Sequence, residues 1–369
     1  MSKRFLIFAK FLFILAICAC EAQPTSTTLP QEEKISVNTN SQPSLYTVIG
    51  VGDMMLGTNY PSKNYLPPNG GTELLSDVTH ILQDADVTFG NLEGTILDSG
   101  GTVKRCQNPN LCYAFRSPES YIQHFVNAGF DVVSIANNHT GDFGASGRKK
   151  TKEVLNNNGI AFAGLASTDE IAFFERAGKR WGFCAFAPNS GTCDIRQLSY
   201  AKRIVESVAA QSDIVIVSFH GGAEGAKNQH VTKKTEKYYG ENRGNVHAFA
   251  HTVIDAGADI VFGHGPHVTR AVELYQNRII AYSLGNFCTY GRFNLRGAAG
   301  IAPILKVHVD EQGKFVYGQL TPIYQEKTHG PKIDPQNRAI KKIRELTQID
   351  FPDTPLEIHE DGTIFKTEF

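Results

Sequence analysis

Apolar runs of strand length alternate with segments of helical periodicity along most of the chain. From Tyr46 onward, the runs YTVIGVGD, DVTFGNLE and FDVVSIANNH are continuous enough to indicate buried strands. Between them lie LLSDVTHILQDA and SYIQHFVNAG, whose apolar residues recur at helical spacing. Repeated strand–helix units predict an α/β fold with a largely parallel sheet and helices outside it.

The second half of the chain continues this pattern and adds hairpins. DIVIVSFH and ADIVFGHGPH are predicted strands, and NVHAFAHTVIDAG between them has helical spacing. AVELYQN and RIIAYSLGNF follow as two hairpin-like strands. These later strands predict a second sheet, and the folded domain is expected to span residues 45–325.

The first 20 residues have the features of an export signal. A basic start, MSKR, precedes an apolar run that only Lys10 interrupts. The stretch Ile17-Cys18-Ala19-Cys20 resembles a bacterial lipobox, so Cys20 would become an acylated N-terminus anchored in the membrane of the cell envelope. Two alternatives stay open: cleavage near Ala22 would give a periplasmic or secreted protein, and an uncut leader would itself be an anchor.

The two flanks of the domain differ from it in composition. Residues 21–44 are rich in Ser, Thr, Gln and Pro with few large apolar side chains, which is typical of a flexible tether. Residues 326–369 contain one basic helix among polar loops. We expect this last segment to form a peripheral C-terminal appendage.

The overall charge excludes one class of function. The chain has 36 Lys and Arg against 37 Asp and Glu, for a formal charge of −1. Removing the leader's three basic residues leaves 33 against 37, or −4, for the mature chain. A weakly acidic balance of this kind argues against nucleic acid as the main partner.

Seven cysteines in an exported protein predict disulfides. With Cys18 removed and Cys20 assigned to lipid, the simplest pairing joins Cys106 to Cys112 and Cys184 to Cys193. Cys288 is then left single. Neither pair has C-x-x-C spacing, which argues against zinc-ribbon and thioredoxin-like chemistry.

Polar side chains stand where five of the predicted strands end. Each residue alone also has a structural explanation, such as a strand-to-loop cap for Asp53 or a satisfied core position for His220. Together they form a mixed oxygen and nitrogen set that suits zinc, manganese or iron better than calcium. The sequence therefore predicts a divalent metal site from these residues: Asp53, Asn91, Glu93, Asn137, Asn138, His139, His220, His264 and His267.

Six ordered motifs resemble those of the CapA poly-γ-glutamate capsule proteins, whose domain is similar to the calcineurin-like metallophosphatases. The motifs are GVGDMMLG, GNLEG, SIANNHTGDFG, SFHGGAE, DAGADIVFGHGPHV and YSLGNF, and the resemblance covers residues 46–324. It implies a four-layer α/β/β/α sandwich with a metal centre at the strand ends.

The resemblance also implies individual roles. The residues at the family's ligand positions are Asp53, Glu93, Asn138, His220, His264 and His267, and His139 stands where metallophosphatases have the acid that protonates the leaving group. The chain departs from the metallophosphatase pattern at two positions, since Met55 replaces a histidine and Glu93 replaces a bridging aspartate. One or two ions are therefore expected.

Two functions of different classes follow from these motifs. The first is metal-assisted hydrolysis or transfer on an anionic γ-glutamyl or phosphoester substrate, with His139 as acid and Asp142 orienting it. Arg116 and Glu224 are expected to contact the substrate, although Arg116 has an equally plain role as a capping or ion-pairing residue. The second function is a non-catalytic, membrane-tethered component that binds polymer or a membrane synthase complex.

Overall fold

A computed structural model describes residues 44–106 and 112–367 of the chain. Residues 43–369 form one compact unit. The predicted signal peptide, the lipobox cysteine Cys20 and nearly all of the predicted tether lie outside the described residues. Within the described residues, no helix has the length and hydrophobicity that a bilayer crossing requires.

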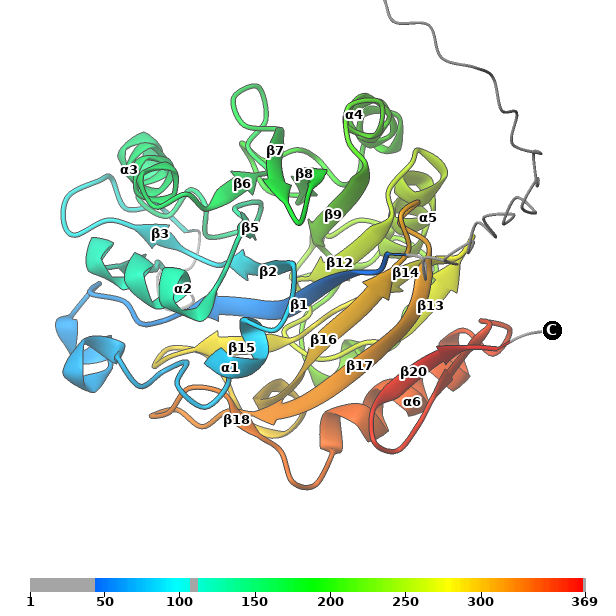
Figure 1. Ribbon diagram of the computed structural model, residues 1–369. Helices are drawn as coiled ribbons and strands as arrows, with labels where there is room; N and C mark the ends of the chain where they lie inside the picture. Colours follow the sequence, from blue (N-terminus) through cyan, green and yellow to red (C-terminus); the bar gives the residue numbers. More distant parts are fainter. Residues whose placement is uncertain (1–43, 107–111, 368–369) are drawn as a thin grey trace, which may run out of the picture. The chain divides into compact units, whose positions relative to one another are not determined.

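The first sheet holds ten strands within the described residues and contains both ends of the folded chain (Figure 1). Its parallel part is formed by β1, β2, β5, β6 and β15. Strand β16 pairs antiparallel with β1 and begins the antiparallel part of the sheet. The strands are β1 (Tyr46–Met55), β2 (Val87–Leu92), β5 (Val132–Ser134), β6 (Ala161–Ala163), β15 (Asn286–Thr289), β16 (Ile301–Val309), β17 (Phe315–Tyr324), β18 (Lys332–Ile333), β19 (Leu356–Ile358) and β20 (Thr363–Lys366).

The second sheet is built from the middle of the described chain and has six strands there, with the order β13-β14-β12-β9-β8-β7. Its central strands are parallel, and β7 and β13 pair antiparallel at its two edges. The strands are β7 (Ile171–Arg176), β8 (Lys179–Phe186), β9 (Ile214–His220), β12 (Ile260–His264), β13 (Val272–Tyr275) and β14 (Arg278–Ala281). Two short ladders lie outside both sheets: β3 (Thr95–Ile96) with β4 (Arg116–Ser117), and β10 (Lys237–Tyr238) with β11 (Glu241–Asn242).

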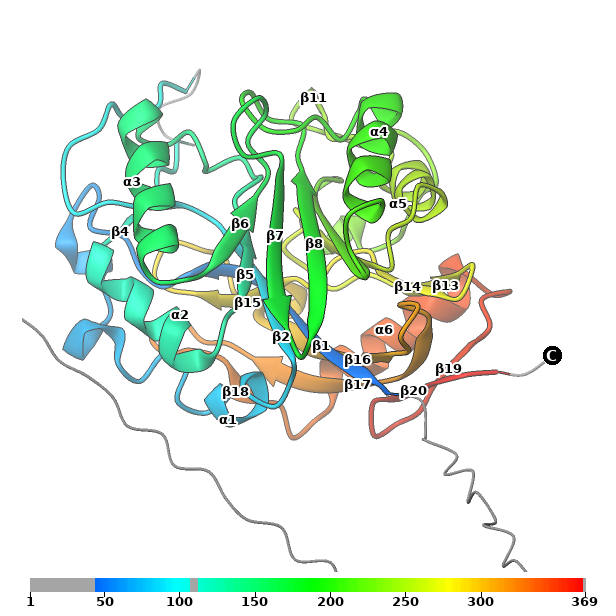
Figure 2. The same ribbon diagram turned by 45° about the horizontal axis from the view of Figure 1, so that its top comes forward.

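The two sheets pack against each other through one hydrophobic cluster, and helices cover their outer faces (Figure 2). Phe89 of β2 stacks on Phe262 of β12 at 5.2 Å between ring centroids, so the inner faces are in direct contact. The first sheet is covered by α1 (Thr79–Leu82), α2 (Ile122–Ala128) and α3 (Gly144–Asn157), and the second by α4 (Leu198–Ala209) and α5 (Val246–Asp255). The predicted four-layer α/β/β/α sandwich is confirmed.

Burial on both faces explains why the strands are continuously apolar. In β1, Val48 faces the inner cluster while Ile49 and Val51 face the helices. Gly50 also faces inward, where a Cβ atom would lie 2.5 Å from the ring of Phe262. The close approach of the two sheets at this point therefore depends on glycine.

Residues 326–369, expected as an appendage, lie within the same compact unit. Strand β20 pairs with β17 and extends the first sheet. Helix α6 (Arg338–Asp350) buries Ile340 and Ile343 in the cluster between the sheets, and Leu346 in the cluster under α4 and α5. The segment thus supplies core side chains to both clusters.

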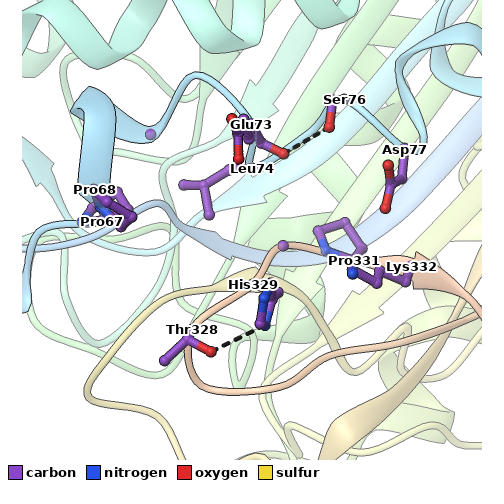
Figure 3. Close-up of a pocket in the computed structure, with 12 residues that line it drawn as sticks. Pro67, Pro68, Glu73, Leu74, Ser76, Asp77, Thr328, His329, Pro331 and Lys332 are labelled. Carbon is purple, nitrogen blue, oxygen red and sulfur yellow. Dashed lines mark hydrogen bonds between the residues drawn. The ribbon is translucent and has the colours of Figure 1, made fainter.

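A surface pocket lies between the segment 67–77 and the segment 328–332 (Figure 3). Its lining includes Glu73, Asp77, His329 and Lys332. None of the residues predicted to bind metal or substrate lines this pocket.

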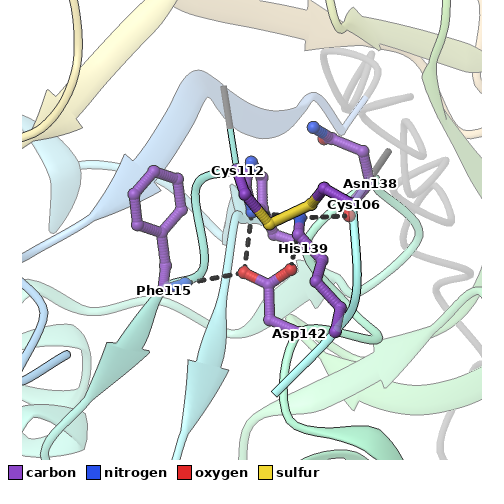
Figure 4. Close-up of a disulfide and its surroundings, with 7 residues drawn as sticks. Cys106, Cys112, Phe115, Asn138, His139 and Asp142 are labelled. Carbon is purple, nitrogen blue, oxygen red and sulfur yellow. Dashed lines mark hydrogen bonds and ion pairs between the residues drawn. A yellow bond between two sulfur atoms is a disulfide. The ribbon is translucent and has the colours of Figure 1, made fainter. Parts of the chain in front are cut away.

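One of the two predicted disulfides forms, between Cys106 and Cys112 (Figure 4). The predicted Cys184–Cys193 disulfide is wrong, because both residues are buried free thiols in the cluster between the second sheet and α4. Burial raises the pKa of Cys193 to about 12 and that of Cys184 well above its usual value, which disfavours the thiolate needed for disulfide formation. Cys288 is a free thiol too, as expected.

Candidate metal centre

The carboxyl ends of parallel strands from both sheets meet at one edge of the sandwich. Asp53 of β1 is in register with Asn91 of β2 and with Asn286 of β15, and Glu93 follows β2 directly. In the second sheet, His264 of β12 is in register with His220 of β9. Because parallel strands end at the same edge, each sheet delivers its polar side chains there.

Glycines allow the two strand ends of the second sheet to approach each other. The amide of Gly221 donates to the carbonyl of His264 at 2.8 Å. Gly265 has a φ of 113°, and a Cβ atom on it would lie 2.7 Å from the backbone of Gly221. His267, two residues later, has a φ of 56°, a left-handed conformation that is uncommon for histidine and turns its ring toward Asp53.

Asp53 connects the first sheet to the histidines of the second. Its Oδ2 lies 2.9 Å from Nδ1 of His267, and its Oδ1 accepts from Nδ2 of Asn91 at 2.8 Å. Nδ1 of His264 lies 3.6 Å from Oδ1. Asn91 also lies 3.4 Å from Nδ1 of His220, so the amide holds the carboxylate and an imidazole in place.

Glu93 lies on the other side of His267. Its Oε1 is 3.6 Å from Nε2 of His267 and 3.8 Å from Nε2 of His139. Ligand atoms of Glu93, His220 and His267 all lie within 4.8 Å of one another. These three side chains therefore converge closely enough to share one ion.

Several buried donor atoms of this centre have no hydrogen-bond partner among the described residues. They are both oxygens of Glu93, Nε2 of His220, both ring nitrogens of His264, and Oδ1 of Asn138. Leaving a buried polar group unpaired costs on the order of 1–3 kcal/mol, and more for a charged group. Carboxylate, amide oxygen and imidazole are ligand types that zinc, manganese and iron accept, so the residues present fit a divalent cation.

Burial and mutual charge shift the ionisation of this cluster strongly. Burial raises the pKa of Glu93 well above its usual value, and the carboxylates of Asp53 and Glu224 raise it further. Burial lowers the pKa of His267, but Glu93 and Asp53 outweigh burial and raise it to about 10. The raised pKa of His267 means that the carboxylates of Glu93, Asp53 and Glu224 favour a positive charge at this position.

The other two histidines are held neutral. Burial lowers the pKa of His264 to about 4 and that of His220 well below its usual value, although Asp53 opposes both shifts. A neutral imidazole keeps the nitrogen lone pair that a metal ion needs. Burial raises the pKa of Asp53, but the hydrogen bond to His267 and the charges of the histidines outweigh burial and lower it to about 2. Asp53 is therefore ionised.

His139 and Asp142 form a hydrogen-bonded pair beside the centre (Figure 4). Nδ1 of His139 lies 2.8 Å from Oδ2 of Asp142, which also accepts from the amide of Phe115 at 2.6 Å. Nζ of Lys104 lies 2.6 Å from Oδ1 of Asp142. Since a carboxylate can only accept, Nδ1 of His139 carries the proton and Nε2 is left facing Glu93.

The Cys106–Cys112 disulfide lies next to this pair (Figure 4). It joins the two segments that hold Asp142, because Lys104 precedes the first cysteine and Phe115 follows the second. The ring of Phe115 also packs on the ring of His139 at 4.3 Å between centroids. The disulfide therefore fixes the surroundings of His139.

The two residues predicted to contact substrate, Arg116 and Glu224, have different surroundings. Arg116 donates from Nε to Oδ1 of Asn59 at 2.6 Å and from a terminal nitrogen to the carbonyl of Gly100 at 2.8 Å, and its guanidinium lies 4.8 Å from the ring centroid of Phe143. These contacts are those of a residue that fixes loops. Glu224, in contrast, is close enough to the centre for its charge to raise the pKa values of Glu93 and His267.

Arg243 is a residue of this region that the sequence did not indicate. Its side chain is 3% exposed and pairs with Glu224 at 3.1 Å. Its charge lowers the pKa values of Glu93 and His220. Arg243 lies in the charged segment between β9 and α5, which has the composition of a surface loop, and no feature of the sequence marks it as buried.

Two asparagines complete the support of the centre. Asn137 donates to Oδ1 of Asn91 at 3.1 Å, and its own Oδ1 accepts from the amide of His139 at 3.1 Å. Asn138, predicted as a ligand, has a buried Oδ1, but no hydrogen bond or ion pair joins its side chain to the other predicted ligands in the described part of the chain. The amides of Asn91 and Asn137 thus connect Asp53 to the backbone of His139.

Comparisons with known proteins identify the family of this chain. Residues 47–290 match the family described as bacterial capsule synthesis protein PGA_cap. The chain is 28% identical to the capsule biosynthesis protein CapA of Bacillus anthracis over 300 residues, which cover 74% of this chain and 65% of that protein. It is 27% identical to the PGA biosynthesis protein CapA of Bacillus subtilis over 318 residues, which cover 81% and 77% of the two chains.

Solved structures of phosphatases are among those similar to this chain. A novel phosphatase from Mycoplasma pneumoniae aligns with a TM-score of 0.46 and 12% identity over 80% of this chain and 96% of that one. A putative 5'-nucleotidase from Staphylococcus aureus aligns with a TM-score of 0.42 and 15% identity over 79% and 55%. Since the family match covers more than half of the sequence, the chain belongs to the bacterial capsule synthesis protein PGA_cap family.

Proposed function

We propose that this protein is a metal-dependent hydrolase or transferase of capsule or poly-γ-glutamate biosynthesis that acts on an anionic substrate. The observation that carries the proposal is the set of buried, unpaired donor atoms on Glu93, His220 and His264 beside the His139–Asp142 pair. Unpaired metal-type ligands next to an oriented imidazole are what metal-assisted hydrolysis requires.

One or two divalent ions, of zinc, manganese or iron, would be held by six side chains. When bound, such an ion lowers the pKa of a water molecule toward neutrality and polarises the bond to be broken. The ligands would be Asp53, Glu93, Asn138, His220, His264 and His267.

His139 would carry the proton transfer. Asp142 accepts from Nδ1 and leaves Nε2 directed toward the centre; its charge favours the imidazolium form, in which Nε2 also carries a proton that it would give to the leaving group. Phe115 and Lys104 hold Asp142 on its remaining sides, so the imidazole cannot turn away without breaking several contacts. This role fits a residue that orients and supplies a proton but does not bind the ion.

The charges around the centre favour an anionic substrate. Lys104 is 25% exposed in its side chain and lies 3.4 Å from Nδ1 of His139, and Arg243 is buried against Glu224. A γ-glutamyl carboxylate or a phosphoester would gain a charge-assisted contact from either cation. Glu224 would then set the position of Arg243, and Arg116 would act at a distance by holding the loops it contacts.

We further propose that the protein works outside the cytoplasm, anchored by an acyl chain on Cys20. The basic and apolar leader and the Ser/Thr-rich tether support this location. A membrane synthase complex would then be the partner that places polymer within reach of the centre. Cleavage near Ala22 would instead give a periplasmic or secreted enzyme with the same chemistry.

The test combines metal analysis with a hydrolysis screen. Purified protein lacking the leader should contain zinc, manganese or iron, and should cleave a γ-glutamyl polymer or a phosphoester in a metal-dependent way. Bound metal with no turnover on either substrate class would overturn the catalytic proposal and favour a polymer-binding component. Absence of bound metal after addition of each ion would overturn the site itself.

A further inference from the structure

A second group of metal-type ligands lies on helix α5, apart from the centre at the strand ends. His247 and His251 are four residues apart on this helix and so share one face. Glu273 of strand β13 completes the group, and ligand atoms of all three residues lie within 4.8 Å of one another. The group shares no residue with the first centre.

The strand alternation of β13 directs Glu273 toward the helix. Its neighbour Val272 packs in the cluster between the sheets, whereas Ala271 and Tyr282 belong to the cluster under α5. Nε2 of His251 lies 2.9 Å and 3.1 Å from the two carboxylate oxygens of Glu273. Helix and sheet edge are therefore already joined by two of the groups that would bind an ion.

Surrounding side chains hold these ligands in position. The hydroxyl of Tyr282 donates to Oε2 of Glu273 at 2.7 Å. The ring of His251 stacks on Tyr275 at 3.7 Å between centroids, and the ring of His247 stacks at 6.3 Å on Tyr282. Outer contacts of this kind orient ligands in metal sites.

Two of the three proposed ligands are partly exposed to solvent. The side chains of His251 and Glu273 are 22% and 11% exposed, so an ion can reach them from solvent. Lys233 lies over the ring of Phe351, on which His247 stacks, and its positive charge opposes a cation.

We propose that His247, His251 and Glu273 form a separate site for one divalent transition-metal ion of the zinc type. Two histidines and one carboxylate supply three ligands, with the remaining position left to water. An ion there would fasten α5 to the edge strand β13. The expected role is stabilisation of this edge of the second sheet, independent of any reaction at the first centre.

The test is zinc binding by the full mature chain without a histidine tag, measured by equilibrium dialysis and elemental analysis. His247→Phe keeps an aromatic ring against Tyr282 and leaves the His251–Glu273 pair intact, so it removes a ligand with little disturbance of the fold. We expect this variant to bind one zinc ion fewer per chain than wild type. His230→Phe, at an exposed histidine paired with Asp350, is the matched control and should bind as wild type does.

A second variant separates this site from the proposed function. In a His220→Ala background, zinc should still raise the melting temperature, and adding His251→Ala should abolish that rise. Equal zinc stoichiometry in His247→Phe, His230→Phe and wild type would overturn the proposal, whether or not the first centre binds metal. Loss of the zinc-dependent rise in His220→Ala alone would overturn it too.

Discussion

Single side chains at the strand ends have several partners each, and this determines what their removal should do. Asp53 contacts His264, His267 and Asn91, so it is tied into both sheets at once. Nε2 of His220 and both ring nitrogens of His264 have no hydrogen-bond partner among the described residues, so these atoms are free to bind an ion. His139 differs, since one of its nitrogens is committed to Asp142.

Replacing His264 or His220 by alanine should lower bound metal and activity together while the domain stays folded. Each variant removes one ligand of several and leaves Asp53 and Glu93 in place. Metal content per chain and circular dichroism of the same preparations check this. His230→Ala serves as the control at an exposed histidine, and unchanged metal in both ligand variants would disprove the site.

Replacing His139 by alanine should separate metal binding from chemistry. The variant should keep most of its metal and lose turnover by roughly 10²–10⁴-fold, the usual contribution of a general acid. Parallel metal analysis and steady-state rates on one substrate measure both effects. If metal and turnover fall together, His139 is a ligand and not an acid.

At the scale of elements, the loop between β3 and β4 determines how well Asp142 and His139 are held. The Cys106–Cys112 disulfide closes a loop with a sequence separation of 6 between Lys104 and Phe115, both of which contact Asp142. Closing this short loop removes little conformational entropy from the unfolded chain, but the disulfide lies close to the proposed catalytic pair. Its effects on stability and on turnover should therefore differ.

The double variant Cys106→Ser, Cys112→Ser should lose turnover more than stability. Closing so short a loop contributes about 2 kcal/mol on the chain-entropy model. The relative loss of turnover should exceed the relative loss of unfolding free energy, because Lys104 and Phe115 would no longer be linked by the disulfide. Thermal melts and steady-state rates of the variant, compared with wild type before and after reduction, test this. A large fall in melting temperature with normal rates would contradict it.

Strands, layers and the site were largely predictable at this scale, and the exceptions have physical reasons. Glu93, His220 and His264 fall where the apolar runs of β2, β9 and β12 stop, and Asp53 interrupts the apolar run of β1 near its end, which is why the sequence indicated these residues. Spacing suggested the wrong pairing for Cys184, because it cannot show that this thiol packs under α4 as a small apolar group.

Contacts between residues far apart in the sequence were the other features that the sequence did not predict. The buried Arg243 pairs with Glu224, 19 positions earlier, and this contact exists only in the fold. Glu273 joins His251 across the β13–helix contact in the same way. The C-terminal helix α6 buries residues at helical spacing, which predicts an amphipathic helix, but the spacing alone does not show that this face packs into the sandwich; the buried residues are Ala339, Ile340, Ile343, Leu346 and Thr347.

For the molecule as a whole, a bound ion would connect the two sheets. Asp53 and Glu93 belong to the first sheet, whereas His220, His264 and His267 belong to the second or follow it directly. Removing metal should therefore loosen the contact between the sheets at this edge. The inner hydrophobic cluster would still hold the sandwich together.

Chelation of the purified protein should lower its melting temperature, and added zinc or manganese should restore it. A ligand that binds only the folded state at 100 times its Kd contributes about 2.7 kcal/mol. Differential scanning calorimetry with and without chelator measures the shift, which should be smaller in His220→Ala. An identical shift in that variant would show that the metal acts elsewhere.

The proposed location of the whole molecule depends on Cys20. Changing Cys20 to serine should move the protein from the membrane fraction to the soluble fraction, because an acyl chain is the expected anchor once the leader is cleaved. Cell fractionation and immunoblotting measure this. Membrane retention of the Cys20→Ser protein would favour an uncut leader.

The order of the strands along the chain also fixes when the centre can be completed during synthesis. The first sheet begins with β1 and ends with β20, and the whole second sheet is made between its two halves. A nascent chain on the ribosome holds Asp53 and Glu93 early, but it lacks a full ligand set until His267 has been made. Products that end between Glu93 and His220 would therefore carry the carboxylates without these histidines, and the proposed metal loading would belong to a late stage of biogenesis.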